Sequence, residues 1–267
     1  MAILFVISFL AVLFLFLIKG RKGHNDLPSL QGWYYAHRGL HGPGVPENSM
    51  AAFAKAKAAG YGIELDVHLM KDGNLAVIHD SSLKRTAGKD VRIEELTASD
   101  LESYRLEGTQ EKIPLLSQVL ELFRGEAPLI IELKSQKDNY GALCAATCEL
   151  LKDYTGTYCM ESFDPRCVAW LRKHRKEIIR GQLTENFFRS QSDLPWVLKF
   201  VMRHQLLNVF TRPDFVAYRF RDRRTLSNVL VRKIWGVQMV AWTIDTQQDL
   251  EAADNEGWIS IFENINP

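Results

Sequence analysis

The chain has 267 residues, of which 46% are hydrophobic and 24% are charged, and its net charge at pH 7 is +1. This composition excludes a largely disordered chain and is sufficient to bury a large core in one domain or two. The near-neutral charge gives no general attraction to nucleic acid, so no nucleic-acid partner is expected. Four cysteines without zinc-type spacing are expected to be buried, reduced thiols: Cys144, Cys148, Cys159 and Cys167.

An apolar segment, residues 2–18, opens the chain and contains Ser8 as its one polar residue. It has about the minimum length of a membrane-spanning helix and is followed by a basic stretch, residues 19–22 (KGRK). A cleaved signal peptide fits less well, because positive charge before the segment and a small-residue cleavage site after it are both missing. We therefore expect an N-terminal transmembrane helix.

The basic residues after this segment indicate its orientation. Positive charges tend to stay on the cytoplasmic side, so they favour a cytoplasmic folded domain, with the opposite orientation left open. The sequence thus predicts a single-pass membrane protein in three parts. These are a transmembrane anchor and basic flank over residues 1–22, a linker over 23–32 and one folded domain over 33–267.

From residue 33 onward, short apolar strands alternate with helical segments. The expected strands are 33–37, 62–67, 75–79, 129–133, 157–161, 178–183, 215–218, 237–243 and 258–262. The expected helices are 50–59, capped by Asn48, and 96–101, 115–123, 140–151, 165–175, 223–235 and 246–256. This alternation predicts an α/β fold, a closed TIM (β/α)8 barrel. The extra strand, 75–79, follows a tight turn and can be an excursion above the barrel.

One segment interrupts the alternation. Residues 193–210 (DLPWVLKFVMRHQLLNVF) are apolar around most of a helix, with Lys199 and Arg203 one turn apart. Two interpretations stay open. We favour an insertion packed in the core, and the alternative is a face that lies in the membrane interface.

Carboxylates interrupt the apolar strands at their carboxyl ends. Glu64 and Asp66 share one face of strand 62–67, because successive side chains of a strand alternate, and Glu132 interrupts strand 129–133. Each carboxylate taken alone is more often a surface residue or half of an ion pair. Together inside a barrel, however, they cannot all stay ionised without a cation. The pattern predicts a divalent-metal site at the barrel mouth, with Ca²⁺ or Mg²⁺ preferred by oxygen ligands.

Two histidines and two cations complete this candidate site. His37 and His79 each end a strand, so both can reach the same mouth. Imidazoles titrate near neutral pH, which lets one take a proton from a nucleophile while the other protonates a leaving alkoxide. Arg38 offers the planar fork that suits a phosphate, and Lys134 can hold a substrate oxygen.

Three further residues receive supporting roles. Glu47 is expected as a partner of the residues that contact the ligand. Asn48 is expected as the cap of helix 50–59 rather than as a catalyst. His68 shares the face of Glu64 and Asp66 and is expected to line the rim.

Several short motifs resemble those of the glycerophosphodiester phosphodiesterase family. They are HRG (37–39), PEN (46–48), IELDV (63–67) with DG (72–73), HD (79–80) and IELK (131–134), with looser agreement at ESFD (161–164) and WT (242–243). The resemblance implies a TIM barrel that uses a divalent metal to hydrolyse glycerophosphodiesters to glycerol 3-phosphate and an alcohol. It implies an acid–base pair of His37 and His79, metal ligands Glu64, Asp66 and Glu132, phosphate contacts Arg38 and Lys134, and Trp242 on the glycerol side.

The chain departs from this family at its end. Residues 262–267 (FENINP) replace a Thr-Asp-x-Pro-like turn, so the shape of the rim and the choice of substrate stay open. One alternative is lysophospholipase D-type hydrolysis by the same site, with residues 193–210 and the anchor delivering lipid. Another is a non-catalytic membrane sensor of glycerophosphodiesters, against which the intact histidine pair argues. Water and a glycerol hydroxyl of the substrate both remain possible nucleophiles.

Overall fold

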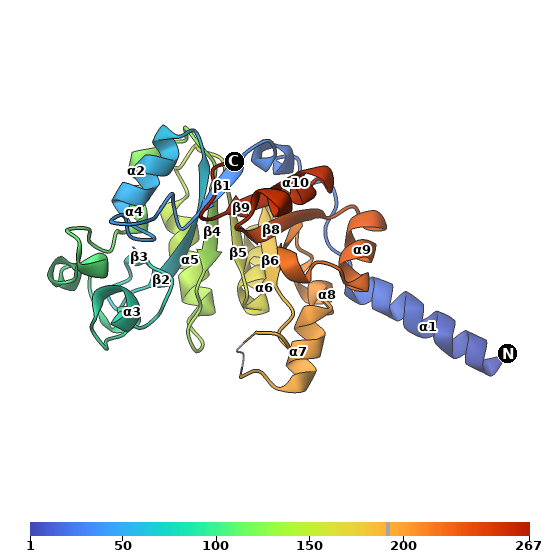
Figure 1. Ribbon diagram of the computed structural model, residues 1–267. Coiled ribbons are helices and arrows are strands. Elements are labelled where there is room, and N and C mark those ends of the chain that lie inside the picture. The colour runs from blue at the N-terminus through green and yellow to red at the C-terminus, as the bar shows by residue number, and fades with distance from the viewer. Residues whose placement is uncertain (191–192) are drawn as a thin grey trace.

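The computed structural model describes residues 1–190 and 193–267. In these ranges one nine-stranded sheet closes on itself by pairing β1 with β2 (Figure 1). Eight strands are parallel, in the order β1-β2-β4-β5-β6-β7-β8-β9, and β3 pairs antiparallel with the end of β2. The predicted TIM barrel is confirmed, and β3 is the predicted excursion.

The bounds of most elements agree with the predicted ones within a few residues. The strands are β1 (Tyr34–His37), β2 (Gly62–Leu69), β3 (Leu75–Val77), β4 (Leu129–Leu133), β5 (Tyr158–Ser162), β6 (Arg180–Thr184), β7 (Phe215–Arg219), β8 (Gln238–Ile244) and β9 (Ile259–Phe262). The helices are α1 (Ala2–Leu17), α2 (Met50–Ala58), α3 (Lys84–Ala87), α4 (Leu116–Phe123), α5 (Tyr140–Leu150), α6 (Pro165–His174), α7 (Trp196–Arg203), α8 (Asn208–Thr211), α9 (Leu226–Lys233) and α10 (Gln247–Asn255).

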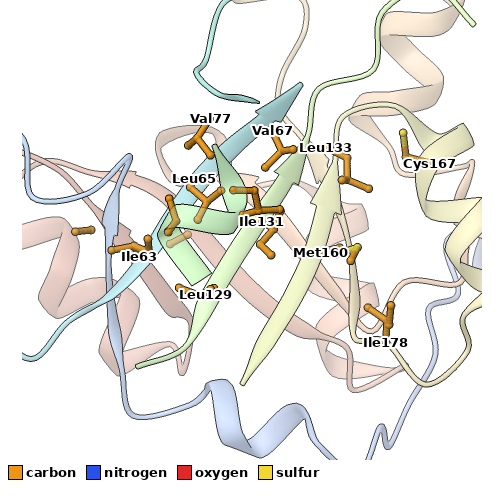
Figure 2. Packing of buried hydrophobic residues seen from close by; sticks show 14 of the residues in the cluster. Ile63, Leu65, Val67, Val77, Leu129, Ile131, Leu133, Met160, Cys167 and Ile178 are labelled. Carbon is orange, nitrogen blue, oxygen red and sulfur yellow. The ribbon is translucent and has the colours of Figure 1, made fainter. Parts of the chain in front are cut away.

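The apolar face of the strands is turned outward, toward the helices. Ile63, Leu65 and Val67 of β2 pack with Ile131 of β4 in one buried cluster (Figure 2). Because alternate residues of a strand point to opposite faces, this packing turns the polar residues between them toward the barrel interior. All four cysteines are free and buried, as predicted: Cys144, Cys148 and Cys167 lie in this cluster, and Cys159 lies in a second one.

Residues 96–101 do not form the predicted α-helix. They lie in the long connection after β3, which contains a 3-10 helix at Asp100–Ser103. Leu96 and Leu101 are nevertheless buried in a separate cluster with residues of this connection. The helical spacing of these apolar side chains therefore indicated burial and not an α-helix.

The predicted transmembrane helix is wrong. α1 has 16 residues, and none of the helices in the described part of the chain is long and apolar enough to cross a membrane. α1 ends at Leu17, and the next residue, Ile18, is fully buried on the barrel, where its carbonyl accepts a hydrogen bond from Asn208. Trp235 donates a further hydrogen bond to the carbonyl of Leu15.

The correction of this helix extends to the predictions that depended on it. The expected single-pass membrane location, the cytoplasmic placement of the domain and the membrane as a partner are not supported without a span. The assignment of residues 23–32 to a linker and 33–267 to the folded domain stays a prediction.

The favoured interpretation of residues 193–210 is also wrong for their first half. None of the residues of α7 is buried, and Trp196 is 73% exposed. Burial begins after this helix, where Gln205 and the residues Asn208 and Thr211 of α8 are covered. α7 follows β6 and projects beyond the ends of the strands (Figure 1), so it lies at the rim and not in the core.

Gly181 provides a test of the packing inside the barrel. A β-carbon at this residue of β6 would lie 2.1 Å from a ring atom of Phe215 on β7. Gly181→Ala should therefore lower the free energy of unfolding by about 1–3 kcal/mol, measured by urea denaturation. Gly141→Ala in α5 is the matched control, because its β-carbon would come no closer than 3.8 Å to Trp170. Equal stabilities of the two variants would contradict this packing.

Candidate active site

Three buried carboxylates meet inside the barrel near the carboxyl ends of β2 and β4. Glu64 and Asp66 lie on β2, and Glu132 of β4 pairs directly with Asp66 in the sheet. One oxygen of each carboxylate lies within 4.8 Å of the others, and each residue is at most 6% exposed. The structure thus brings together the three residues that the sequence proposed as metal ligands.

Two cations lie against this carboxylate cluster. Lys134 Nζ is 3.0 Å from Asp66 Oδ1 and 2.8 Å from Glu132 Oε1. Arg38 Nε is 3.5 Å from Asp66 Oδ2, and the Arg38 backbone N–H donates to Glu64 Oε2 at 3.1 Å. Two positive charges against three carboxylates leave a deficit of one positive charge when all are ionised.

The electrostatics of the carboxylate cluster favour an additional cation. Burial, with the charges of Asp66 and Glu132, raises the pKa of Glu64 well above its usual value. Burial also raises the pKa of Glu132 to about 7, although Lys134 opposes the shift. For Asp66 the attraction of Lys134 and Arg38 outweighs burial and lowers the pKa well below its usual value. A divalent cation with a preference for oxygen ligands would replace the protons that Glu64 and Glu132 otherwise retain.

His37 ends β1 beside Glu64. Its Nε2 atom is 4.0 Å from Glu64 Oε2, and its Nδ1 atom is 2.6 Å from Glu263 Oε2, just after β9. Burial lowers the pKa of His37, and the hydrogen bond from His37 lowers the pKa of Glu263 to about 2. With Nδ1 donating to the ionised Glu263, the Nε2 atom of a neutral His37 is free to accept a proton.

His79 has a similar hydrogen-bond arrangement. Its Nδ1 atom is 2.6 Å from Asp80 Oδ1, and Arg85 Nε donates to the other oxygen of Asp80 at 2.5 Å. Arg85 also donates two hydrogen bonds to Glu47. Burial, followed by the charge of Lys134, lowers the pKa of His79 to about 4. Both histidines therefore bind a carboxylate through Nδ1, which leaves both Nε2 atoms for chemistry.

The supporting residues differ in part from their predicted roles. Glu47 is a partner of Arg38, as predicted, with a hydrogen bond of 2.9 Å. His68 is fully buried and does not line the rim, because its two ring nitrogens contact Glu94 and the backbone carbonyl of His79.

Asn48 is not the cap of α2. The N-cap is Ser49, and Asn48 adopts a positive φ of 51°. Its side-chain amide donates to Asp66 Oδ2 at 2.8 Å, and Asn48 is 1% exposed. Asn48 and Ser49 both have side chains that can cap a helix, and only one is needed. The sequence therefore indicated that the other side chain could make a different contact.

Glu263 is a residue of the site that no sequence motif indicated. The unusual chain end, residues 262–267, predicted only a different shape of the rim. Residue 263 directly follows β9, which pairs with β1, so its carboxylate reaches the histidine that ends β1. The first and last strands of a closed barrel are neighbours, so a carboxylate just after the last strand could have been predicted to lie near the histidine that ends the first.

Trp242 lies near the carboxyl end of β8 as part of an aromatic wall. Its ring is edge-on to Phe163, with centroids 5.4 Å apart, and Phe163 is edge-on to Phe187 at 6.3 Å. Within the described residues, the Nε1 atom of Trp242 is buried without a hydrogen-bond partner. The wall therefore combines apolar surface with one unused donor.

The fold and the site define a TIM-barrel enzyme with an acidic centre and two histidines at its mouth. Residues 37–262 match the family model described as the Glycerophosphoryl diester phosphodiesterase family, and the chain belongs to this family. This confirms the family to which the sequence motifs pointed.

Two relatives and one solved structure extend this comparison. The chain is 35% identical to a lysophospholipase D of Rattus norvegicus over 56% of this chain and 49% of that protein, so it spans about half of the rat protein. It is 35% identical to a lysophospholipase D of Homo sapiens over 94% of this chain and 88% of that protein. A phosphodiesterase of Oleispira antarctica, solved with the product sn-glycerol-3-phosphate, has a TM-score of 0.72 at 24% identity, covering 88% of this chain and 93% of that one. This last likeness supports the fold alone.

The raised pKa of Glu132 predicts how stability depends on pH when no divalent cation is bound. Between its usual value of 4.5 and about 7, Glu132 is protonated in the folded state and ionised in the unfolded state. Glu132 alone should therefore lower the free energy of unfolding by up to about 3 kcal/mol as pH rises through this window. The lowered pKa values of His37 and His79 act in the opposite direction below about pH 6.5, so the contribution of Glu132 is the difference between the wild type and Glu132→Gln. Urea denaturation in chelator at about pH 5 and about pH 7.5 measures the change.

Variants separate this effect from general acid sensitivity. Glu132→Gln should remove the loss of stability that Glu132 contributes, whereas Glu95→Gln, at an exposed acid, should leave the pH dependence as in the wild type. Added Mg²⁺ should restore wild-type stability at the higher pH, because the ion replaces the proton. Parallel changes in the stability of the wild type and of Glu132→Gln over this window would contradict the assignment.

Proposed function

We propose that this chain hydrolyses glycerophosphodiesters to glycerol 3-phosphate and an alcohol at the mouth of its barrel, with a bound Ca²⁺ or Mg²⁺. The observation that carries the proposal is the convergence of Glu64, Asp66 and Glu132 beside Lys134 and Arg38. Membership of the family supports the class of reaction.

The donor set of the carboxylate cluster fits a hard divalent cation. Glu64, Asp66 and Glu132 would hold it, and their oxygens are the ligands that Ca²⁺ and Mg²⁺ prefer. Such a cation, when bound, would polarise the phosphate and offset the charge that develops on it. The three carboxylates, with Lys134 and Arg38, have a net charge of −1, and a phosphodiester adds another −1. A divalent ion balances this total.

The two histidines move the protons in the proposed reaction. One Nε2 atom accepts the proton of the nucleophile, and the other protonates the leaving alkoxide. Glu263 and Asp80 hold the Nδ1 atoms of His37 and His79, which keeps both rings oriented. A non-catalytic sensor has no need of two such pairs, so this arrangement favours the enzyme over the sensor.

The remaining residues bind the substrate. Lys134 and the guanidinium of Arg38 contact the phosphate oxygens, and the free Nε1–H of Trp242 donates to a hydroxyl on the glycerol side. The nucleophile is water or a neighbouring glycerol hydroxyl, which would give a cyclic phosphate first. Hydrolysis in heavy-oxygen water, combined with trapping of a cyclic product, distinguishes the two.

Substitution of either histidine tests the proposed mechanism. His37→Ala and His79→Ala should each lower kcat on glycerophosphocholine by about 10²–10⁴-fold, because each removes one proton-transfer group. His174→Ala, at an exposed histidine of α6, is the control and should retain wild-type activity. Chelator should abolish the activity and Mg²⁺ or Ca²⁺ should restore it. Undiminished turnover by His37→Ala would eliminate this mechanism, and activity in chelator would eliminate the role of the metal.

A second candidate is hydrolysis of lysophospholipids at the same site. α7 exposes a set of large apolar side chains, and its last turn is attached to the barrel where Thr184, at the end of β6, donates to the Met202 carbonyl at 2.9 Å. The exposed residues of α7 are Trp196, Val197, Leu198 and Phe200. Together with the aromatic wall of Trp242, Phe163 and Phe187, they offer apolar surface to an acyl chain. Both relatives described above are named lysophospholipases D, which supports this candidate.

Substitutions on α7 separate the two substrates. The double variant Trp196→Ser, Phe200→Ser should lower kcat/KM for a short-chain lysophosphatidylcholine by about 10-fold or more, because two apolar contacts are lost. Activity on glycerophosphocholine, which has no acyl chain, should not change. Lys199→Ser on the same helix is the matched control. Equal losses on both substrates would contradict a role for α7 in binding the acyl chain.

A further inference from the structure

His41 lies beside the candidate active site with an unused ring nitrogen. It follows β1 in a tight loop that the pairing of Gly42 with Val45 closes. Its Nε2 atom is buried and has no hydrogen-bond partner within residues 1–190 and 193–267. A buried imidazole nitrogen without a partner is costly, so it indicates a site that can accept a ligand.

Glu263 joins His41 to His37. One oxygen of Glu263 is 2.6 Å from His37 Nδ1, and the other is 3.7 Å from His41 Nε2. The three potential ligand atoms all lie within 4.8 Å of one another. The side chains are 16%, 17% and 27% exposed for His37, His41 and Glu263, so the three residues lie nearer to solvent than the carboxylate cluster.

We propose that His37, His41 and Glu263 form a second metal site, which binds Zn²⁺ or a similar transition-metal ion and is distinct from the carboxylate cluster. Two imidazole nitrogens and one carboxylate suit zinc, whereas the all-carboxylate centre suits Mg²⁺ or Ca²⁺. Tetrahedral zinc with bonds of about 2.0 Å needs donors roughly 3.3 Å apart, so movements of about 1 Å bring these three atoms into place. The fourth position stays open to solvent.

Occupation of this site would inhibit the enzyme, and this part of the inference rests on the proposed function. The ion takes the Nδ1 atom of His37 and separates it from Glu263. The proton of the neutral imidazole then moves from Nδ1 to Nε2, and no proton is gained or lost. The Nε2 atom, which lies 4.0 Å from Glu64, becomes a donor and can no longer accept a proton from the nucleophile. His41 thereby makes the reaction sensitive to zinc without taking part in it.

Metal binding provides the first test, because it does not depend on turnover. The full chain is saturated with Mg²⁺ to occupy the carboxylate cluster and titrated with Zn²⁺ against a chromophoric chelator, with Co²⁺ as the spectroscopic probe. The wild type should bind one zinc ion that His41→Ala binds about 100-fold more weakly, as expected for the loss of one of three ligands. His174→Ala should bind zinc as the wild type does. Equal zinc affinity of the wild type and His41→Ala overturns the site.

Inhibition provides the second test. Zn²⁺ at the occupying concentration should inhibit the Mg²⁺-loaded wild type and His174→Ala but not His41→Ala, whose activity without zinc should equal that of the wild type. His41→Asn, which keeps a polar group of similar size, should behave like His41→Ala and shows that the imidazole is the cause. Zinc binding that depends on His41 but leaves the wild type fully active supports the metal site and overturns its inhibitory role. Inhibition of His41→Ala at the same zinc concentration overturns the inhibitory role of the site.

Discussion

The arrangement of the site depends on one electrostatic constraint: the carboxylates Glu64, Asp66 and Glu132 are buried together beside two cations, Lys134 and Arg38, and a fourth buried carboxylate, Glu161, pairs with Glu132 in the sheet. Lys134 forms ion pairs with Asp66 and Glu132, and Arg38 forms one with Asp66. The pKa of Glu64 is nevertheless raised well above its usual value. Such a cluster is unfavourable unless protons or a cation neutralise it. The barrel tolerates it because the strands that carry the carboxylates are fixed on their other face by apolar packing.

The same fixed strands determine how the histidines are presented. His37 and His79 each bind a carboxylate through Nδ1, but these carboxylates come from different sources. Asp80 is the neighbour of His79 in the chain, whereas Glu263 arrives from the far end of the chain, 226 residues from His37. Closure of the sheet between β1 and β9 brings this second pair together. The two proposed proton-transfer groups therefore depend on local sequence in one case and on complete folding in the other.

The rim is less constrained than the interior of the barrel. The connection after β6 contains α7 with its exposed apolar residues, and the loop after β1 contains His41 with its unused nitrogen. Neither feature is required to close the barrel or to hold the carboxylates. Choice of substrate and sensitivity to a second metal can thus be added at the rim without change to the centre, as is common in enzymes of this fold.

The sequence by itself determined the alternation of strands and helices, the closed barrel and the set of polar residues that interrupt the strands, and it left open whether the extra strand lies outside the barrel. These features follow from the local spacing of apolar residues, which indicates the side chains that are buried in a strand or a helix. Only the tertiary structure decided what covers them. Ile18 directly after α1 is buried on the barrel, no residue of the apolar helix α7 is buried, and Leu96 and Leu101 are buried without forming an α-helix. Likewise, Asn48 forms a hydrogen bond with Asp66, and Glu263 forms one with His37. These contacts join segments that are distant in the chain, and no local sequence pattern predicts them.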